Sequence, residues 1–199
     1  IDGHAPGIRG KEVQAYRLAG VENDHECSTA EEVLDKLRAG LHIYVREGSG
    51  AKNLETLIKT MLDAGVCLDR CAFCTDDKHV EEIRKEGHIS TCIRKAIALG
   101  VPVAKAYKMG SYQAAEFYGL KNYGAIGAGY RADIVFLDDL EQVRPLDVMK
   151  DGRILTEEDY AKDYSVPVPD ELLHTVHVGE VTKEKIRLSC DGKTDVIQM

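Results

Sequence analysis

The chain has 199 residues, which is enough for roughly one large domain or one and a half ordinary ones. Its formal net charge of -8 argues against nucleic acid or an anionic membrane as a main partner, because both require a basic face. No apolar run approaches the ~20 residues that a membrane helix needs. The 6 cysteines lack the density of a disulfide scaffold and favour a reducing, cytoplasmic compartment.

The first part of the chain alternates short apolar strands with amphipathic helices. Strand-like segments, by β-propensity and alternation, fall at residues 1–4, 21–26, 41–45 and 70–75. Each intervening helix is followed by a glycine suited to a C-cap: Gly20, Gly40 and Gly65. Strands separated by helices in this way predict βα units and a parallel sheet, and four such units amount to half of a (β/α)8 barrel. A half barrel leaves an open edge that needs its missing half or a partner.

The remainder of the chain changes in texture. Residues 81–118 have helical spacing, and a glycine-rich stretch then leads into a strand, expected to be buried, at 132–137. Asp151-Gly152 predicts the turn of a hairpin, and Pro167-Val168-Pro169 is typical of a linker. We therefore expect three segments along the chain: a barrel half at 1–122, a β-rich segment of a small domain at 123–165, and a further segment at 166–199.

Three of the predicted strand ends carry possible metal ligands. His4 follows the first strand, His25 the second and Asp76 the fourth. A divalent metal that activates water needs neutral imidazoles and carboxylates that converge around an open position. Asp76 is also placed to take a proton from water and return it to a leaving group. Each residue alone is more often a core or capping residue, but their repeated placement predicts a hydrolytic metal centre.

Other polar residues lie beside these candidates. Glu26 follows His25 directly and is either a proton shuttle or a solvated carboxylate. Arg46, Glu47 and Ser49 end the third strand, where they can bind the polar atoms of a substrate. A structural ion-pair arrangement of Arg46 with Glu47 is an equally good interpretation of the same residues.

Four motifs together resemble the adenine deaminases of the amidohydrolase superfamily. In chain order they are Asp2-Gly3-His4-Ala5-Pro6-Gly7, Asn23-Asp24-His25-Glu26, Arg46-Glu47-Gly48-Ser49 and Cys74-Thr75-Asp76-Asp77-Lys78-His79. The stretch from Asn122 to Asp133 is similar to the return of amidohydrolases into their small β domain. The resemblance covers essentially the whole chain, and the four strand-end motifs are its specific part.

The resemblance implies strands five to eight of a metal-dependent (β/α)8 barrel, part of a small β-sandwich domain, and, at 166–199, the truncated start of a C-terminal domain. It also implies hydrolysis of adenine to hypoxanthine and ammonia, a purine-salvage reaction, at a two-metal site holding manganese or iron, with zinc possible. His4, His25 and Asp76 would be metal ligands, with Asp77 as the alternative to Asp76. The implied catalytic residues are Asp76 and Glu26, and the implied substrate-binding residues are Arg46, Glu47, Ser49 and Asp77.

The sequence departs from the family in one large respect. The family's first-strand His-x-His pair and its strand-four carboxylate are absent, so we expect an incomplete metal site and an inactive chain. The missing N-terminal half of the barrel or another chain, as in a homo-oligomer, would have to supply the rest. Two alternatives stay open: another amidohydrolase that acts on cyclic amides, like dihydroorotase or hydantoinase, and a non-catalytic scaffold half.

Overall fold

The computed structural model describes residues 1–162, 165–187, 189 and 192, and residues 1–157 form one compact unit. A second unit begins at residue 158. The helices of the described residues are α1 (Lys11–Leu18), α2 (Ala30–Arg38), α3 (Leu54–Asp63), the 3-10 turn η1 (Leu68–Arg70), α4 (Val80–Glu86), α5 (Ile89–Ala98), α6 (Val103–Gly110), α7 (Tyr112–Phe117), α8 (Glu157–Ala161) and α9 (Asp170–Leu173). Within this part of the chain, none of them is long and apolar enough to cross a membrane.

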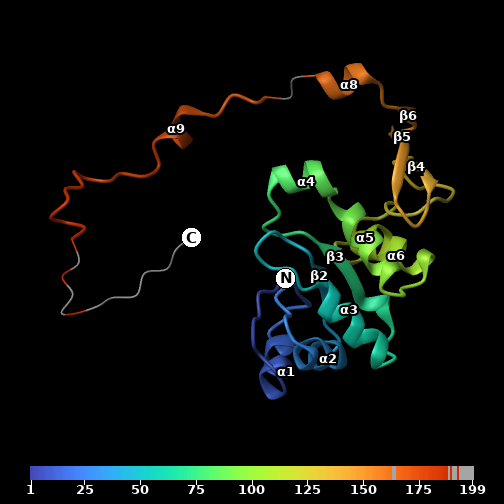
Figure 1. The fold of residues 1–199 in the computed structure, drawn as a ribbon, viewed down its shortest axis with the longest axis horizontal. Coiled ribbons are helices and arrows are strands. Elements are labelled where there is room, and N and C mark those ends of the chain that lie inside the picture. Colours follow the sequence, from blue (N-terminus) through green and yellow to red (C-terminus); the bar gives the residue numbers. More distant parts are fainter. Residues whose placement is uncertain (163–164, 188, 190–191, 193–199) are drawn as a thin grey trace. The chain divides into compact units, whose positions relative to one another are not determined.

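A parallel sheet lies at the centre of the compact unit (Figure 1). Its strands are β1 (Asn23–Asp24), β2 (His42–Arg46) and β3 (Cys71–Cys74), in that spatial order. The βα alternation expected from the sequence is therefore confirmed for these three strands. Parallel pairing brings the carboxyl ends of all three strands to one edge, because Asp24 pairs with Ile43 and Arg46 pairs with Cys74.

The strand expected at residues 1–4 does not form. Its backbone groups form one backbone hydrogen bond with the next segment, from Glu22 N to Ile1 O, and one bond from Gly3 N to the Asn23 side chain. A side-chain amide thus replaces the backbone ladder that a strand requires. Gly3 lies so close to the neighbouring segment that a Cβ at this position would be 1.9 Å from Asn23 O. The segment that carries His4 is therefore irregular backbone held against β1.

Helices cover the parallel sheet and supply the core. The helix α3 follows the spacing expected from the sequence, and its inward residues Leu54, Leu57, Ile58 and Met61 are fully buried. Helices α2 and α3 pack on β2, whereas α5, α6 and α7 pack on β3. This core fixes the sheet, and with it the edge where the candidate residues lie.

A second, antiparallel sheet consists of β4 (Ile134–Asp139), β5 (Arg144–Lys150) and β6 (Arg153–Ile154). The predicted hairpin is confirmed: Lys150 pairs with Arg153, and Asp151 and Gly152 both have positive φ, as a tight turn requires. The prediction of a buried strand at 132–137 was wrong in its burial, since Val135 and Phe136 are 53% and 40% exposed. Within the described residues no second sheet covers this one, so part of its apolar surface stays open.

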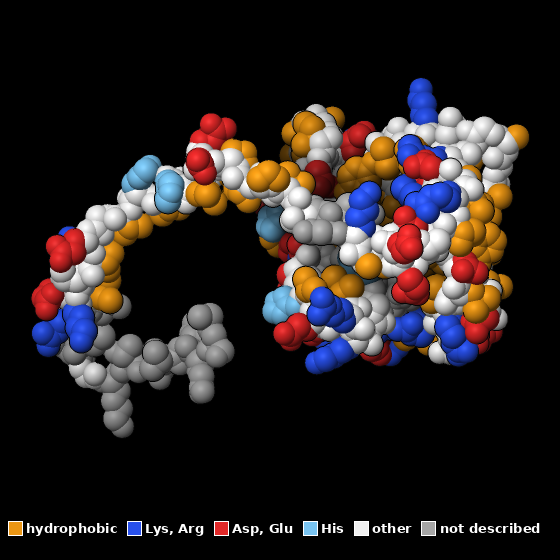
Figure 2. All heavy atoms as spheres, turned by 90° about the horizontal axis from the view of Figure 1, so that it is seen from above, with side chains coloured by type: hydrophobic (Ala, Val, Ile, Leu, Met, Phe, Trp, Pro, Cys, Tyr) orange, Lys and Arg blue, Asp and Glu red, His pale blue; other side chains and the backbone are white. Residues whose placement is uncertain are grey.

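The expected segment boundaries after residues 122 and 165 remain predictions. The second sheet lies in the same compact unit as the parallel sheet, because the unit extends to residue 157. Figure 2 shows acidic and basic side chains interspersed over the face of the compact unit that it presents.

Glu32 secures the start of α2. Its side chain accepts hydrogen bonds from the backbone N–H groups of Ser28 and Thr29, and the Thr29 hydroxyl accepts one from Glu32 N, which completes a capping box. A fourth bond, from Gly7 N, ties the same carboxylate to the loop after His4. Burial alone would raise the pKa of Glu32, but the N–H groups of Ser28, Gly7 and Thr29 outweigh it and lower the pKa from 4.5 to about 2.

We expect the unfolding free energy of the Glu32→Gln variant to depend less on pH in the acid range than that of the parent chain. Because the folded-state pKa lies below the unfolded value, this carboxylate stabilises the fold fully above pH 4.5 and loses its effect as the pH falls toward 2. At pH 7 the variant should lose roughly 2 kcal/mol of unfolding free energy, and that difference should shrink on acidification. Urea unfolding followed by circular dichroism between pH 7 and pH 2.5 measures it. The exposed neighbour Glu31→Gln is the control, and a pH-independent difference for Glu32→Gln would contradict the assignment.

Candidate metal centre

Two histidines and a glutamate converge beside the carboxyl end of β1. His4 Nδ1 lies 3.4 Å from Glu26 Oε1, His25 Nε2 lies 3.2 Å from the same oxygen, and one ligand atom from each residue lies within 4.8 Å of the others. The two imidazole rings are 5.6 Å apart between centroids. The His4 side chain is 69% exposed and that of Glu26 is 14% exposed, so the group is open on one side. The structure thus brings together His4 and His25, as expected.

The short length of β1 explains why Glu26 joins this group. In a continuing strand, Glu26 would point away from His25. The strand instead ends at Asp24, and a bend follows at His25. Adjacent residues can then direct their side chains to the same side.

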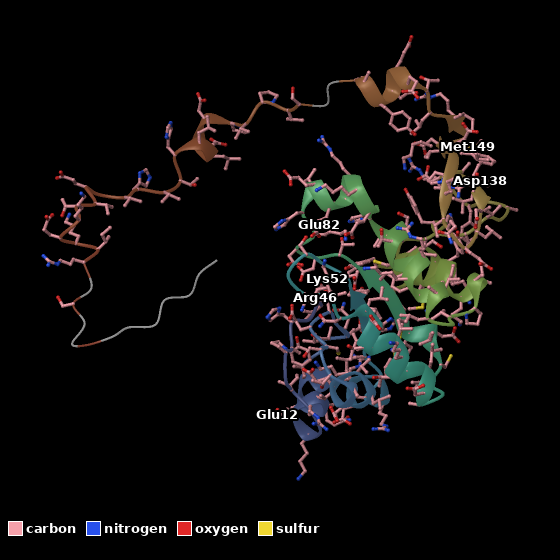
Figure 3. The ribbon with its side chains drawn as sticks, viewed as in Figure 1. Glu12, Arg46, Lys52, Glu82, Asp138 and Met149 are labelled. Atoms are coloured by element: carbon pink, nitrogen blue, oxygen red, sulfur yellow. The ribbon has the colours of Figure 1, made fainter. Side chains whose placement is uncertain are left out.

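Arg46 links this group to the end of the third strand. The guanidinium Nη1 donates to Glu26 Oε1 at 2.6 Å and to Asp76 Oδ2 at 2.7 Å, and Nη2 lies 3.4 Å from Asn53 Oδ1. The Arg46 side chain is only 10% exposed. Burial alone would lower the pKa of Arg46, but bonds to Asp76 and Glu26 outweigh it and raise that pKa. Figure 3 labels Arg46 with Lys52 and Glu82, whose charged groups lie 4.0 Å apart.

Asp76 reaches the cluster through Arg46 and is not a member of the His4, His25 and Glu26 group. It occupies the turn after β3 with a φ of 45°, a left-handed conformation that aspartate tolerates better than most residues. The neighbouring Thr75 side chain lies 2.7 Å from His88 Nε2. The sequence offered no signal for this contact of His88.

The remaining candidates have partners within the protein. Glu47 is buried, and its Oε1 accepts from Lys95 Nζ at 2.6 Å. Asp77 accepts hydrogen bonds from the backbone N–H groups of Gly50 and Ser49, and these bonds lower its pKa despite the opposing effect of desolvation. The Ser49 hydroxyl donates to Glu82 Oε2 at 2.5 Å. These three residues thus organise the loop after β2, beside the cluster of His4, His25 and Glu26.

Two buried residues that were not among the candidate site residues bind the segment that carries His4. Asp24 and Lys36 have fully buried side chains, and Lys36 Nζ lies 2.9 Å from Asp24 Oδ2. Asp24 could have been found from the sequence because it directly precedes His25. Lys36 could not, because it belongs to a charged helix that looks like an ordinary surface helix in the sequence. The backbone of His4 is also held by Tyr16, whose hydroxyl accepts a hydrogen bond from His4 N at 2.8 Å.

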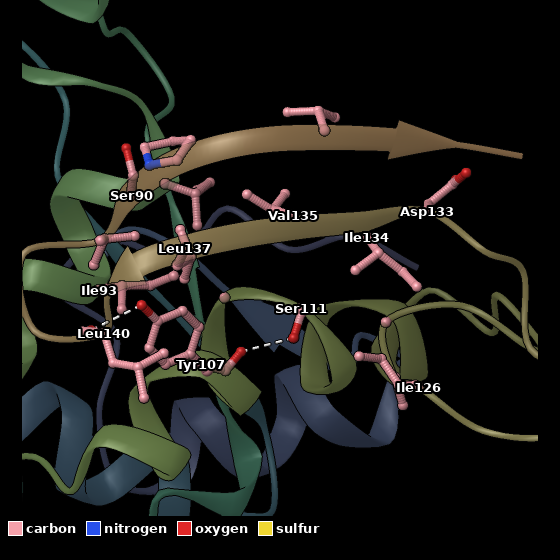
Figure 4. A pocket seen from close by; sticks show the side chains of 17 residues that line it. Ser90, Ile93, Tyr107, Ser111, Ile126, Asp133, Ile134, Val135, Leu137 and Leu140 are labelled. Carbon is pink, nitrogen blue, oxygen red and sulfur yellow. Dashed lines mark hydrogen bonds between the residues drawn. The ribbon is translucent and has the colours of Figure 1, made fainter. Parts of the chain in front are cut away.

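A cavity of about 520 Å³ lies elsewhere, between helices α5 and α6 and the antiparallel sheet (Figure 4). Its lining is largely apolar and includes Ile93, Tyr107, Val135 and Leu137, and the Tyr107 hydroxyl donates to Leu140 O. None of the candidate residues lines it. The metal candidates therefore belong to the parallel sheet edge and not to this cavity.

The donor set of the cluster suits a divalent cation of intermediate softness. Two imidazole nitrogens and a carboxylate oxygen are ligands that zinc, manganese and iron accept, and a half-open group leaves room for water. Arg46 is a protein cation placed between two carboxylates, and it pairs with both of them in this structure. The residues present therefore fit a metal, with Asp76 available once the guanidinium moves.

Curated relatives agree with the resemblance expected from the four motifs. The chain is 42% identical over 198 residues to an adenine deaminase of Clostridium acetobutylicum, a match that covers 98% of this chain and 34% of that protein. It is 40% identical over 199 residues to an adenine deaminase of Desulfitobacterium hafniense, covering 100% and 35%. The chain thus spans about a third of the length of these curated relatives.

Solved structures share the fold. A crystal structure of a beta-aspartyl dipeptidase from Fervidobacterium islandicum superposes with a TM-score of 0.59 at 19% identity, over 82% of this chain and 48% of that chain. At this identity the similarity concerns the fold alone. The model of the Amidohydrolase family matches residues 1–155, which include the parallel sheet, the cluster at its edge and the hairpin. The chain belongs to the amidohydrolase family.

Proposed function

We propose that this chain forms part of an enzyme that hydrolyses adenine to hypoxanthine and ammonia, in purine salvage. The observation that carries the proposal is the convergence of His4, His25 and Glu26 at the edge of a parallel sheet in a chain about 40% identical to adenine deaminases. We place the reaction in the cytoplasm and assign manganese or iron to the site, with zinc as the other possible metal. The three strands would correspond to strands six to eight of a (β/α)8 barrel, with residues 1–4 in the place of strand five.

The residues of the chain would divide the work as follows. His4, His25 and Asp76 would ligate the metal, which when bound lowers the pKa of water. Glu26 lies within hydrogen-bonding reach of both imidazoles, so it can hold them in place or accept a proton. Asp76 would carry the proton to the departing ammonia.

Substrate binding would fall to residues at the ends of β2 and β3. Arg46 contacts Glu26 of the cluster, and its fork of donors would suit the ring nitrogens of a purine if it moved away from Asp76. Glu47, Ser49 and Asp77 would shape the pocket wall, since each is held by partners of the protein.

The catalytic site would be completed by the other strands of a barrel. The chain spans about a third of its curated relatives, and its sheet has three strands in the described residues. We therefore propose that a second barrel half, or another chain in a homo-oligomer, supplies further ligands, and that the chain alone turns over little or no adenine.

We expect His4→Ala and His25→Ala each to weaken divalent-metal binding by at least about tenfold, because each removes one of few ligands. Calorimetric titration of the 199-residue chain with zinc or manganese measures the effect. His174→Ala, in the second unit, is the matched control and should bind as the parent does. Unchanged affinity in both cluster variants would place the metal elsewhere.

We expect Arg46→Met to tighten metal binding by about tenfold or more, because it removes a competing cation and frees two carboxylates. The same change should lower the unfolding free energy of the metal-free chain by about 1–2 kcal/mol, since Glu26 loses a charged hydrogen bond. Metal titration and urea unfolding measure the two effects. Lys59→Met, which breaks an exposed helix pair with Glu55, should leave metal binding unchanged. Weaker metal binding by Arg46→Met would show that the guanidinium does not compete with the metal for the two carboxylates.

The substrate is tested in a chimera. This chain replaces the matching third of the Clostridium acetobutylicum adenine deaminase, in the presence of manganese or iron. Ammonia release is measured with adenine, and formation of the ring-opened N-carbamoyl product is measured with dihydroorotate and hydantoin. We expect release from adenine alone, a drop of at least about a hundredfold in the Asp76→Asn chimera, and no turnover by the isolated chain. Preference for a cyclic amide, or a folded and metal-loaded chimera without activity on adenine, would overturn the proposal.

A further inference from the structure

We infer that Lys36 and Asp24 are positioning residues that clamp the backbone of Ala5 and thereby set where His4 lies relative to His25. The inference deepens the proposed function, because it concerns the residues that hold the two candidate metal ligands. Neither residue contacts the imidazole rings, so both would act through the backbone.

The clamp holds both backbone polar groups of one residue. Ala5 N donates to Asp24 Oδ1 at 2.9 Å, and Lys36 Nζ donates to Ala5 O at 2.6 Å. The clamp is closed by the bond from Lys36 Nζ to Asp24 Oδ2 at 2.9 Å. All three residues are buried, so water does not compete for these bonds.

The positions of these residues in the chain give the clamp its effect. Ala5 follows His4 directly, and Asp24 precedes His25 directly. Residues 1–4 form no strand, so the regular ladder that would otherwise fix His4 is missing. The clamp therefore joins the two ligand-bearing segments at the residues adjacent to the ligands.

Residues of α2 and of the loop before it contact the residues of the clamp. Glu32, one turn before Lys36, accepts from Gly7 N at 2.5 Å and lies 3.9 Å from Lys36 Nζ. Cys27 Sγ donates to Asp24 Oδ2 at 3.4 Å. Burial raises the pKa of the Cys27 thiol, which keeps it a neutral donor. Apolar side chains would fill the same space without holding Ala5, so a charged pair here points to a positioning role.

The test uses three variants of the 199-residue chain. Lys36→Met removes one arm but leaves Asp24 as a lone buried charge, which can prevent folding. The double variant Asp24→Leu with Lys36→Met removes both charges together with both side-chain hydrogen bonds to Ala5, and should fold. Gln113→Leu is the matched control: its buried side-chain amide donates to Leu68 O and Cys71 O at the amino end of β3, away from the cluster.

Two readouts need no metal. In the parent chain we expect a nuclear Overhauser effect between the His4 and His25 rings, and slow hydrogen exchange at the Ala5 amide. In the double variant the ring contact should disappear and Ala5 exchange should accelerate at least about tenfold relative to core amides. The Gln113→Leu control should keep both. A folded double variant with the ring contact and the slow Ala5 exchange intact would overturn the clamp.

A third readout separates the clamp from the metal centre. Titration with zinc or manganese should show a loss of about 10–100-fold in the double variant and none in the control. If the parent binds no metal while the ring contact still depends on Lys36 and Asp24, the clamp stands and the metal centre fails. If the parent binds metal and the double variant binds it equally well, the clamp is overturned and the metal centre stands.

Discussion

Parallel pairing of three short strands is the constraint on which the rest of the structure depends. Because β2 and β3 end together, at Arg46 and Cys74, the residues that follow them are delivered to one edge of the sheet. The strand β1 ends earlier, at Asp24, so its two following residues turn toward the same region. Helices on the sheet bury most residues of the strands and leave the edge as the place where polar residues can gather.

The carboxylates at this edge are paired with cations of the protein, although one arginine is shared by two of them. Arg46 satisfies Glu26 and Asp76 together, Lys95 satisfies Glu47, and Lys36 satisfies Asp24. Carboxylates that converge in a half-buried place need cations, whether these come from side chains or from solution. An edge whose carboxylates are paired within the protein can fold before a metal binds, which separates the stability of the fold from the occupancy of the site.

Structural features that depend on residues close in the sequence were predicted, whereas those that depend on tertiary contacts were missed. The amphipathic pattern identified α3 and Asp151-Gly152 identified the hairpin turn, since each depends on residues close in sequence. The convergence of His4 with His25 followed from strand ends, but the loss of the first strand did not, because it depends on contacts of Gly3 with β1. Lys36 was missed because a buried lysine and a surface lysine look the same in a helix pattern.

Gly3 has a consequence that reaches beyond its own backbone. It carries no chemical group, yet any side chain at this position would collide with the carbonyl of Asn23 and push the His4 segment away from β1. In a mutational scan that records only activity, substitution of Gly3 would give the same result as substitution of a candidate histidine ligand. Selection for a metal site of this design would therefore constrain Gly3, which has no side chain, as strongly as the residues that bind the metal.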